Sequence, residues 1–183
     1  DDDGDGYVDD FLGWNWVNDN NNPLDDAGHG SHLAGTIAAT GGNAEGVVGI
    51  APWVRIMVLK VCDSRGSCLS SDVRAGIQYA VSHGAKVINI SLGGAATASD
   101  TAAFDALITD AANQGVVVVT AAGNSSTDAT AVVPGNATHA VTVSAHADDG
   151  ELCSTFSNTG LKVDVSAPGC GFNGVSEISA ILS

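Results

Sequence analysis

The stretch from Asp26 to Thr40, DAGHGSHLAGTIAAT, places His29 and His32 three residues apart at the start of a helix-like segment. Residues at this spacing lie above one another on one helix face. Two histidines could ligate a metal, but H-x-x-H alone is a weak signal and the chain has no H-E-x-x-H motif. The small residues around them could instead allow close helix packing. A neutral imidazole is also suited to taking a proton from a nucleophile.

Alternating strands and helices must position these histidines. β-rich and apolar runs predict strands at 54–61, 86–91, 116–122, 140–145 and 162–167. Helical spacing between them predicts one helix that begins at Ser71 or Asp72 and ends at Gly84, and a second from near Ser99 to Gly115. The order indicates an α/β fold with a parallel sheet, whose sites form outside the carboxyl ends of the strands.

Two glycine-containing segments follow strands of the predicted sheet. The first is SLGG, comprising Ser91, Leu92, Gly93 and Gly94, and the second is AAGN, comprising Ala121, Ala122, Gly123 and Asn124. Taken alone, each is an ordinary turn after a buried strand. Their position at strand ends makes them candidates for the same site as the histidine segment.

Four segments together resemble landmarks of one enzyme family. GHGSHLAGTIAA resembles the histidine motif of the subtilisin-like serine proteases (subtilases, peptidase S8), usually written H-G-T-H-V-A-G-T. KVINISLGG and VVVVTAAGN resemble the next two landmarks in the same order, and VDVSAPG resembles the segment that leads towards the serine motif. The resemblance implies a three-layer α/β/α fold with a mainly parallel sheet. Residues 1–183 would then be a partial peptidase domain, incomplete at both ends.

The resemblance assigns roles by position. His29 matches the catalytic base, and His32 matches the second histidine of the motif, whose role is structural. Asn124 matches the side-chain donor of the oxyanion hole, where an amide stabilises charge that appears only in the transition state. Ser91, Leu92, Gly93 and Gly94 match the edge that receives an extended peptide, and Ala121, Ala122 and Gly123 match a wall of the pocket for the residue before the scissile bond.

The other two members of a serine-protease triad are not matched in this chain. Ser176, Ser179 and Ser183 do not fit the family's Gly-Thr-Ser-Met-Ala-like motif, and Asp1 to Asp10 follow no apolar strand. Asp25 and Asp26 stand too close to the histidine motif to fit the family's order. We therefore expect the parent protein to be a serine endopeptidase acting through an acyl-enzyme, and the 183 residues alone to be inactive. A non-catalytic scaffold or binding domain is the alternative, and a calcium-binding adhesion module is a weaker one.

The charge balance restricts the partners. The chain carries 21 Asp and Glu against 6 Lys and Arg, a formal net charge of −15. A nucleic-acid partner would require a basic stripe, and anionic membrane surfaces are disfavoured for the same reason. The longest apolar run is far too short for a membrane span. We expect polypeptide substrates, no nucleic acid, no membrane and a monomeric state.

The first 26 residues form an acidic, loop-like region. DDDGDGYVDD places Asp1, Asp3, Asp5 and Asp9 in the pattern that opens an EF-hand loop, but the twelfth position is Leu12 instead of Glu. This segment could bind structural Ca²⁺ with another closing ligand, or could be only an acidic turn. The asparagine-rich segment 15–23 resembles another calcium loop, but its amides are weaker ligands than carboxylates.

The four cysteines fall into two local pairs, Cys62 with Cys68 and Cys153 with Cys170. Neither pair has zinc-knuckle spacing. Two disulfides would fit a secreted or extracellular protein. Four free buried thiols are the alternative, because sequence alone cannot choose among the three possible pairings.

Overall fold

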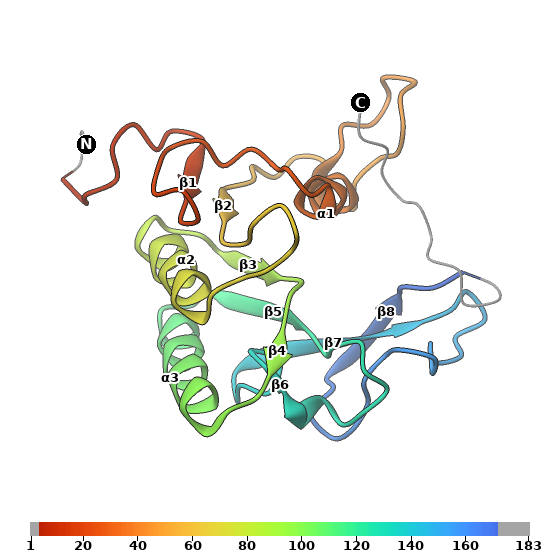
Figure 1. The fold of residues 1–183 in the computed structure, drawn as a ribbon. Coiled ribbons are helices and arrows are strands. Elements are labelled where there is room, and N and C mark those ends of the chain that lie inside the picture. The colour runs from red at the N-terminus through yellow and green to blue at the C-terminus, as the bar shows by residue number, and fades with distance from the viewer. Residues whose placement is uncertain (1–3, 172–183) are drawn as a thin grey trace. The chain divides into compact units, whose positions relative to one another are not determined.

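The computed structural model describes residues 4–171, and Figure 1 shows their fold. These residues form two compact units, 4–76 and 77–171, with the boundary inside helix α2 (Ser70–Ser82). Each unit is described by itself below.

The first unit holds a small parallel sheet and helix α1 (His29–Ala38). Strand β1 (Gly13–Asn15) pairs with β2 (Val58–Lys60), with Gly13 opposite Val58. The prediction that residues 1–26 are all loop is wrong at β1. The pairing requires glycine at position 13, where φ is 119°, because a Cβ there would lie 1.8 Å from the Val58 carbonyl oxygen. Strand β2 is shorter than the predicted run 54–61.

Aromatic side chains hold the acidic N-terminal segment to this small sheet. Trp14 is buried in β1. The ring of Tyr7 meets the rings of Trp14 and Trp16 edge-on, with centroid distances of 5.0 and 5.8 Å. Such pairs contribute about 0.5–1.5 kcal/mol beyond the area they bury. The acidic segment is therefore packed against β1.

The second unit contains a four-stranded parallel sheet in the order β3-β5-β7-β8. The strands span Val87–Ile90 (β3), Val117–Ala121 (β5), Ala140–His146 (β7) and Val165–Pro168 (β8). Every strand overlaps its predicted range, and the predicted α/β class with a mainly parallel sheet is confirmed. Alternate residues of β3, Ile88 and Ile90, are buried, as are Val118 and Thr120 of β5.

Helices α2 and α3 (Ala98–Asn113) match the two predicted helices. Gly84 and Gly115 follow them with φ of 77° and 80°, the left-handed conformation that ends a helix. The predicted cap near Ser99 is wrong by two residues, because the Thr97 side chain accepts the Asp100 N–H at 3.0 Å. Helix α3 packs along β5 (Figure 1) and buries Phe104, Ile108 and Ala111.

A short antiparallel pair lies beside the main sheet. Strand β4 (Gly94–Ala95) pairs with β6 (Val132–Val133), and the 3-10 turn η1 (Ala129–Ala131) comes before β6. The sequence did not predict this pair, since two-residue strands are too short to show a period. The pairing fixes the backbone that follows β3.

Both sequence-predicted cysteine pairs are disulfides, Cys62–Cys68 and Cys153–Cys170.

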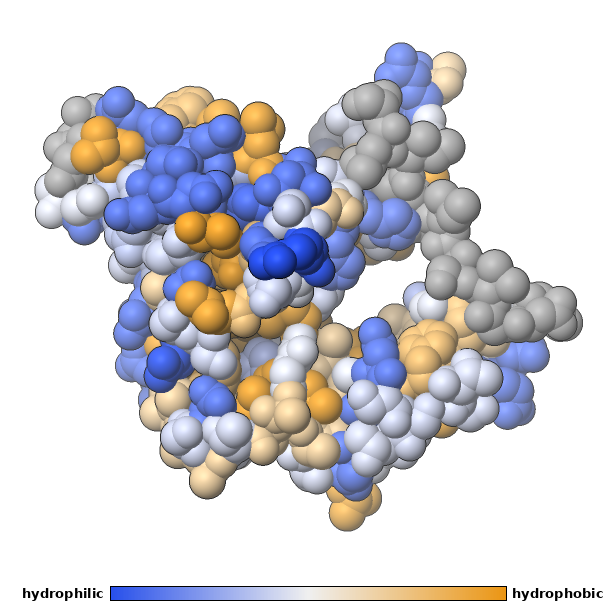
Figure 2. All heavy atoms as spheres, viewed as in Figure 1, coloured by the Kyte–Doolittle hydropathy of each residue, from blue (hydrophilic) through white to orange (hydrophobic). Residues whose placement is uncertain are grey.

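Hydrophobic residues occur in several places between hydrophilic ones on the face drawn in Figure 2. Among residues 4–171, the structure contains no helix with the length and apolar character needed to cross a bilayer.

Candidate active site

His29 is the first residue of α1, and its side chain is exposed. The residue before it, Gly28, adopts φ 83°, a left-handed conformation that glycine takes without strain. This turn sets the direction in which the chain enters the helix. None of the residues of α1 is buried, so the helix presents the imidazole at an accessible end.

The carboxylate of Asp25 holds the N-terminus of α1. Its Oδ1 accepts the N–H groups of Ala27 and Gly28 at 3.0 and 2.9 Å, and its Oδ2 accepts that of Ser31 at 2.7 Å. Burial would raise the pKa of Asp25, but the backbone N–H groups of Ser31, Ala27 and Gly28 and the Ser31 side chain outweigh it and hold the pKa well below its usual range. Asp25 therefore stays ionised and satisfies the N–H of Ser31, in the first turn of the helix, together with two N–H groups of the turn that precedes it.

Two further contacts fix the ends of this segment. Lys60 of β2 forms an ion pair with Asp26, with Nζ and Oδ1 2.5 Å apart, and the Lys60 side chain is only 9% exposed. At the other end of α1, the N–H groups of Gly49, Ile50 and Ala51 donate to carbonyls of α1 or the residue after it. The helix that carries His29 is thus tied at both ends within its own unit.

Asn124 lies in the second unit, just beyond the carboxyl end of β5. Ala121 ends the strand, the side chain of Ala122 is buried, and Gly123 adopts φ 104°. A Cβ on Gly123 would lie 2.5 Å from Nδ2 of Asn158. Glycine is therefore required both by the backbone conformation and by the space. Asn124 itself is exposed.

Asn158 is a buried residue that joins both sides of the Asn124 turn. Its side chain is inaccessible to solvent. Its Oδ1 accepts the N–H groups of Ser125 at 2.9 Å and Thr127 at 3.0 Å, and its Nδ2 donates to the Ala122 carbonyl at 2.9 Å. The Asn158 N–H donates to the Gly123 carbonyl at 2.9 Å. The sequence analysis missed this residue, because an asparagine between two strands reads only as turn chemistry.

The segment predicted to receive a peptide connects β3 to β4. Ser91 and Leu92 are half-buried, and the Ser91 hydroxyl accepts a hydrogen bond from the Asn89 side chain at 3.0 Å. Gly93 packs tightly, since a Cβ there would lie 2.8 Å from a methyl of Val132. Gly94 is open, with nothing within 4 Å of the corresponding position. The backbone of Gly94 is itself paired with Val133 of β6, so the 91–94 segment leads into a short antiparallel pair.

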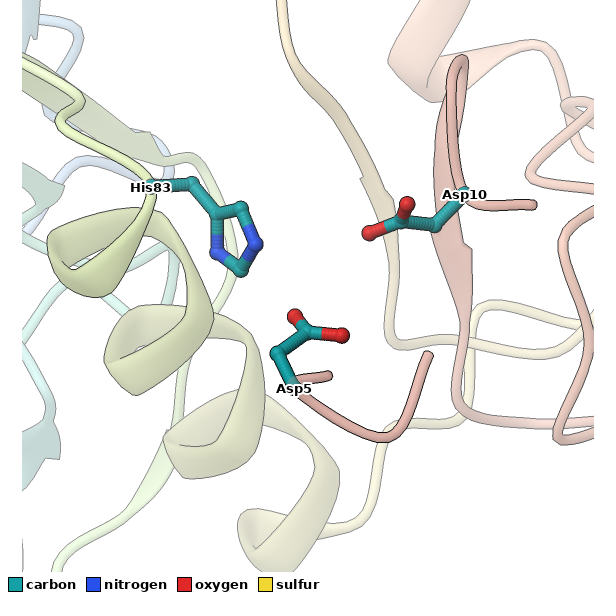
Figure 3. Close-up of side chains that lie close together, drawn as sticks. All are labelled: Asp5, Asp10 and His83. Carbon is teal, nitrogen blue, oxygen red and sulfur yellow. The ribbon is translucent and has the colours of Figure 1, made fainter. Parts of the chain in front are cut away.

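Of the predicted calcium ligands, Asp1 and Asp3 lie outside the described residues, whereas Asp5 and Asp9 are exposed. A carboxylate oxygen of Asp5 lies within 4.8 Å of one from Asp10. Figure 3 draws these two side chains, together with His83, which follows α2 in the second unit. Oxygen ligands of this kind suit calcium, so the described part of the segment is compatible with a hard cation.

The asparagine-rich loop after β1 holds its shape through its own hydrogen bonds. The side-chain oxygen of Asn15 accepts the Asn18 N–H at 3.2 Å, and that of Asn20 accepts the Asn22 N–H at 3.0 Å. Asn15 and Asn20 also exchange backbone hydrogen bonds. The side chains of Asn15 and Asn20 are thus engaged in hydrogen bonds within the loop.

The structure groups the predicted site residues by unit. His29 and His32 share α1 in the first unit, whereas the 91–94 segment and residues 121–124 lie in the second, at the ends of the neighbouring strands β3 and β5. Ser176, Ser179 and Ser183 lie outside the described residues. Sequence reasoning missed that Asp25 accepts an N–H from the first turn of α1, because the N-cap position itself is Gly28 and Asp25 lies three residues before it.

Comparison with known proteins gives consistent results. The model of the subtilase family matches residues 1–183. The chain is 40% identical over 157 residues to thermitase of Thermoactinomyces vulgaris, covering 86% of this chain and 54% of thermitase. It is 38% identical over 160 residues to subtilisin E of Bacillus subtilis (strain 168), covering 86% of this chain and 41% of that protein. The chain thus spans about half the length of these curated relatives.

Solved structures show the same likeness in three dimensions. A cold-adapted subtilisin-like serine proteinase aligns with a TM-score of 0.74 at 31% identity, covering 91% of this chain and 61% of that one. A lanthipeptide protease aligns with a TM-score of 0.77 at 27% identity, covering 89% of this chain and 49% of that one.

Proposed function

Because the chain belongs to the subtilase family, we propose that the protein containing it is a serine endopeptidase and that His29 is its general base. The observation that carries this proposal is the exposed imidazole at the first position of α1, where Asp25 holds the helix terminus. A base fixed in this way can take the proton of a serine hydroxyl as the hydroxyl attacks a peptide carbonyl. The same proton then passes to the leaving amine, and water releases the acyl-enzyme.

The second unit supplies the substrate-binding part of the proposal. Asn124 donates its amide N–H to the oxyanion that develops on the attacked carbonyl. The segment from Ser91 to Gly94 pairs with the peptide as an added strand, and the small residues Ala121 to Gly123 border the pocket for the residue before the scissile bond. The substrates are polypeptides, bound by a monomeric enzyme without nucleic acid or membrane partners.

No residue of these 183 matches the family's nucleophilic serine or its orienting aspartate. The 183 residues contain no Gly-Thr-Ser motif. We therefore expect this polypeptide to hydrolyse no peptide when it is produced alone. Secretion is supported by the two disulfides, which persist in oxidising compartments.

Structural calcium at the acidic N-terminal segment is a further part of the proposal. Asp5 and Asp10 bring two carboxylates together, and the first 54 residues contain no Lys or Arg. A bound Ca²⁺ would neutralise this charge and hold the segment against β1.

The test uses the full-length protein, a fluorophosphonate probe that labels activated serines, and peptide p-nitroanilide substrates. We expect His29→Ala to lower hydrolysis by about 10²- to 10⁴-fold or more and to abolish labelling. His139→Ala, which alters an exposed histidine in the turn before β7, is the matched control. Labelling that survives in His29→Ala would contradict the assignment of the base. An unsubstituted protein that neither labels nor hydrolyses would instead be a non-catalytic relative.

A further inference from the structure

We propose that Asn158 is a positioning residue for catalysis, which holds Asn124 where it meets the oxyanion. This inference rests on the proposed function, because it gives Asn158 a role only through Asn124. Asn158 does not touch the substrate in this proposal. It acts on the backbone of the turn from Ala122 to Thr127.

The hydrogen bonds of Asn158 go to both sides of Asn124. Its Nδ2 and backbone N–H donate to the carbonyls of the two preceding residues, Ala122 and Gly123. Its Oδ1 accepts the N–H groups of Ser125 and Thr127. One side chain, together with its own backbone N–H, therefore fixes the chain immediately before and immediately after the exposed Asn124.

The turn needs this support because its backbone is not in a relaxed conformation. Ser126 adopts φ 50°, a left-handed conformation that is uncommon for residues other than glycine. Its N–H donates to the Phe156 carbonyl at 2.8 Å, and its hydroxyl to the Ser154 carbonyl at 3.2 Å. Such conformations persist only where the surroundings impose them. The segment that ends at Asn158 imposes this one.

That segment is itself anchored to the sheet. The Ser157 hydroxyl accepts the Ala145 N–H of β7 at 2.9 Å. Cys153 is bonded to Cys170, beyond β8. The turn that carries Asn124 is thus linked to β7 and to the segment beyond β8, in addition to the strand β5 that precedes it.

A purely structural role would not require this pattern of hydrogen bonds. An asparagine that only stabilises the core need not form its hydrogen bonds with the residues on either side of one exposed side chain. Asn158 does so from a fully buried position, and Gly123 has no Cβ, which leaves the space that the Asn158 amide occupies. Gly123 and Asn158 therefore form one fitted pair beneath Asn124.

The experiment compares kcat and KM for peptide p-nitroanilides in the full-length protein. Asn158→Ala removes all three side-chain hydrogen bonds, and we expect kcat to fall by about 10- to 10²-fold, in line with the effect of about 1 Å of misplacement. KM should change by less than about threefold, since the ground-state contacts of the peptide remain. Asn158→Asp keeps the one oxygen that accepts both N–H groups but sets a second oxygen against the Ala122 carbonyl, so it should lower kcat as Asn158→Ala does.

Asn136→Ala is the matched control. Asn136 is a half-buried asparagine of the same unit whose Nδ2 donates to the Thr101 hydroxyl and the Thr130 carbonyl, both at 3.1 Å. It holds a turn that does not include Asn124. Both variants lower the melting temperature if asparagines here only stabilise the fold, but only Asn158→Ala should lower kcat.

A double variant separates this inference from the proposed function. Asn124→Ala alone should lower kcat by about 10²–10³, a figure that comes from a subtilisin and not from this structure. In that background Asn158→Ala should change kcat less than about twofold further, because residues acting as a unit are not additive. If Asn124→Ala lowers kcat and Asn158→Ala does not, the inference is overturned and the proposed function stands. If neither substitution lowers kcat, or the unsubstituted protein hydrolyses nothing, the proposed function fails and the inference fails with it.

Discussion

Replacing Asp25 tests how the first unit presents His29. The carboxylate accepts three backbone N–H groups at 2.7–3.0 Å, two on Oδ1 and one on Oδ2. Asp25→Ala leaves all three without this acceptor. Asp25→Asn keeps one oxygen, so its new NH₂ group must face either Ser31 or the pair Ala27 and Gly28. The alanine variant should therefore be the less stable of the two.

The magnitude follows from the capping role. Asp25 accepts the Ser31 N–H as an N-cap side chain would, although the N-cap position is Gly28. Losing such an acceptor costs about 0.5–2 kcal/mol, and the favourable position of a negative charge at a helix N-terminus adds about 0.3–1 kcal/mol. Asp25 is exposed, so solvent screens part of this. We expect about 1.5 kcal/mol for Asp25→Ala and about half of that for Asp25→Asn. For a protein of 150–250 residues, 1 kcal/mol corresponds to about 2–4 °C in melting temperature.

The effect should depend on pH in one direction. The pKa of Asp25 is lowered in the folded protein by the N–H groups of Ser31, Ala27 and Gly28, against the opposing effect of burial. Its stabilisation is therefore fully present above the unfolded pKa of about 3.9 and is lost as the pH falls below that value towards the folded pKa. The stability difference between the unsubstituted protein and Asp25→Asn should be constant between about pH 5 and 8 and should narrow below about pH 4.

The assay is urea unfolding followed by circular dichroism at several pH values, with amide hydrogen exchange at Ser31. Asp148→Asn removes an equal charge from an exposed turn after β7 and is the control. Exchange at Ser31 should quicken in the Asp25 variants and stay unchanged in the control. Equal unfolding free energies for all variants at pH 7, with unchanged exchange at Ser31, would refute the capping role of Asp25.

Two further predictions concern the covalent and ionic links. Replacing both cysteines of the Cys153–Cys170 disulfide, which lie 17 residues apart, should lower the free energy of unfolding by about 3 kcal/mol in the chain-entropy model. The same replacement should quicken amide exchange in the Asn124 turn. Unchanged exchange there would show that the disulfide does not support that turn. Calcium should raise the melting temperature of the full-length protein in proportion to the logarithm of its concentration above Kd, and an Asp5→Asn, Asp10→Asn double variant should reduce this rise. An undiminished rise in that variant would place calcium elsewhere.

The sequence predicted the elements with strong periodic or apolar patterns. The runs around Val118 and Ile88 are strands that bury alternate residues. Gly84 and Gly115 ended their helices as expected, since the left-handed conformation after a helix favours glycine. Strand β1 was missed because its pairing with β2 depends on a glycine fitting against a distant backbone.

The candidate site was predicted only as far as its exposed residues. His29 and Asn124 stand in recognisable motifs, whereas the side chains of Asp25 and Asn158 form hydrogen bonds with backbone atoms of other residues. The hydrogen bonds of Asn158 reach residues 31 to 36 positions earlier in the chain. Contacts of this range follow from the pairing of strands and leave no local pattern in the sequence. Supporting residues of a site are therefore the part that needs a structure.

The hydrogen bonds of Asn158 beside Asn124 leave the neighbouring side chains free to vary. The side-chain oxygen of Asn158 accepts the backbone N–H groups of Ser125 and Thr127. Every residue except proline has such an N–H group. The side chains at these two positions are therefore free to change while Asn124, the proposed oxyanion donor, keeps its place. Natural variation or directed evolution can reshape the surface beside the reacting carbonyl without disturbing the chemistry next to it.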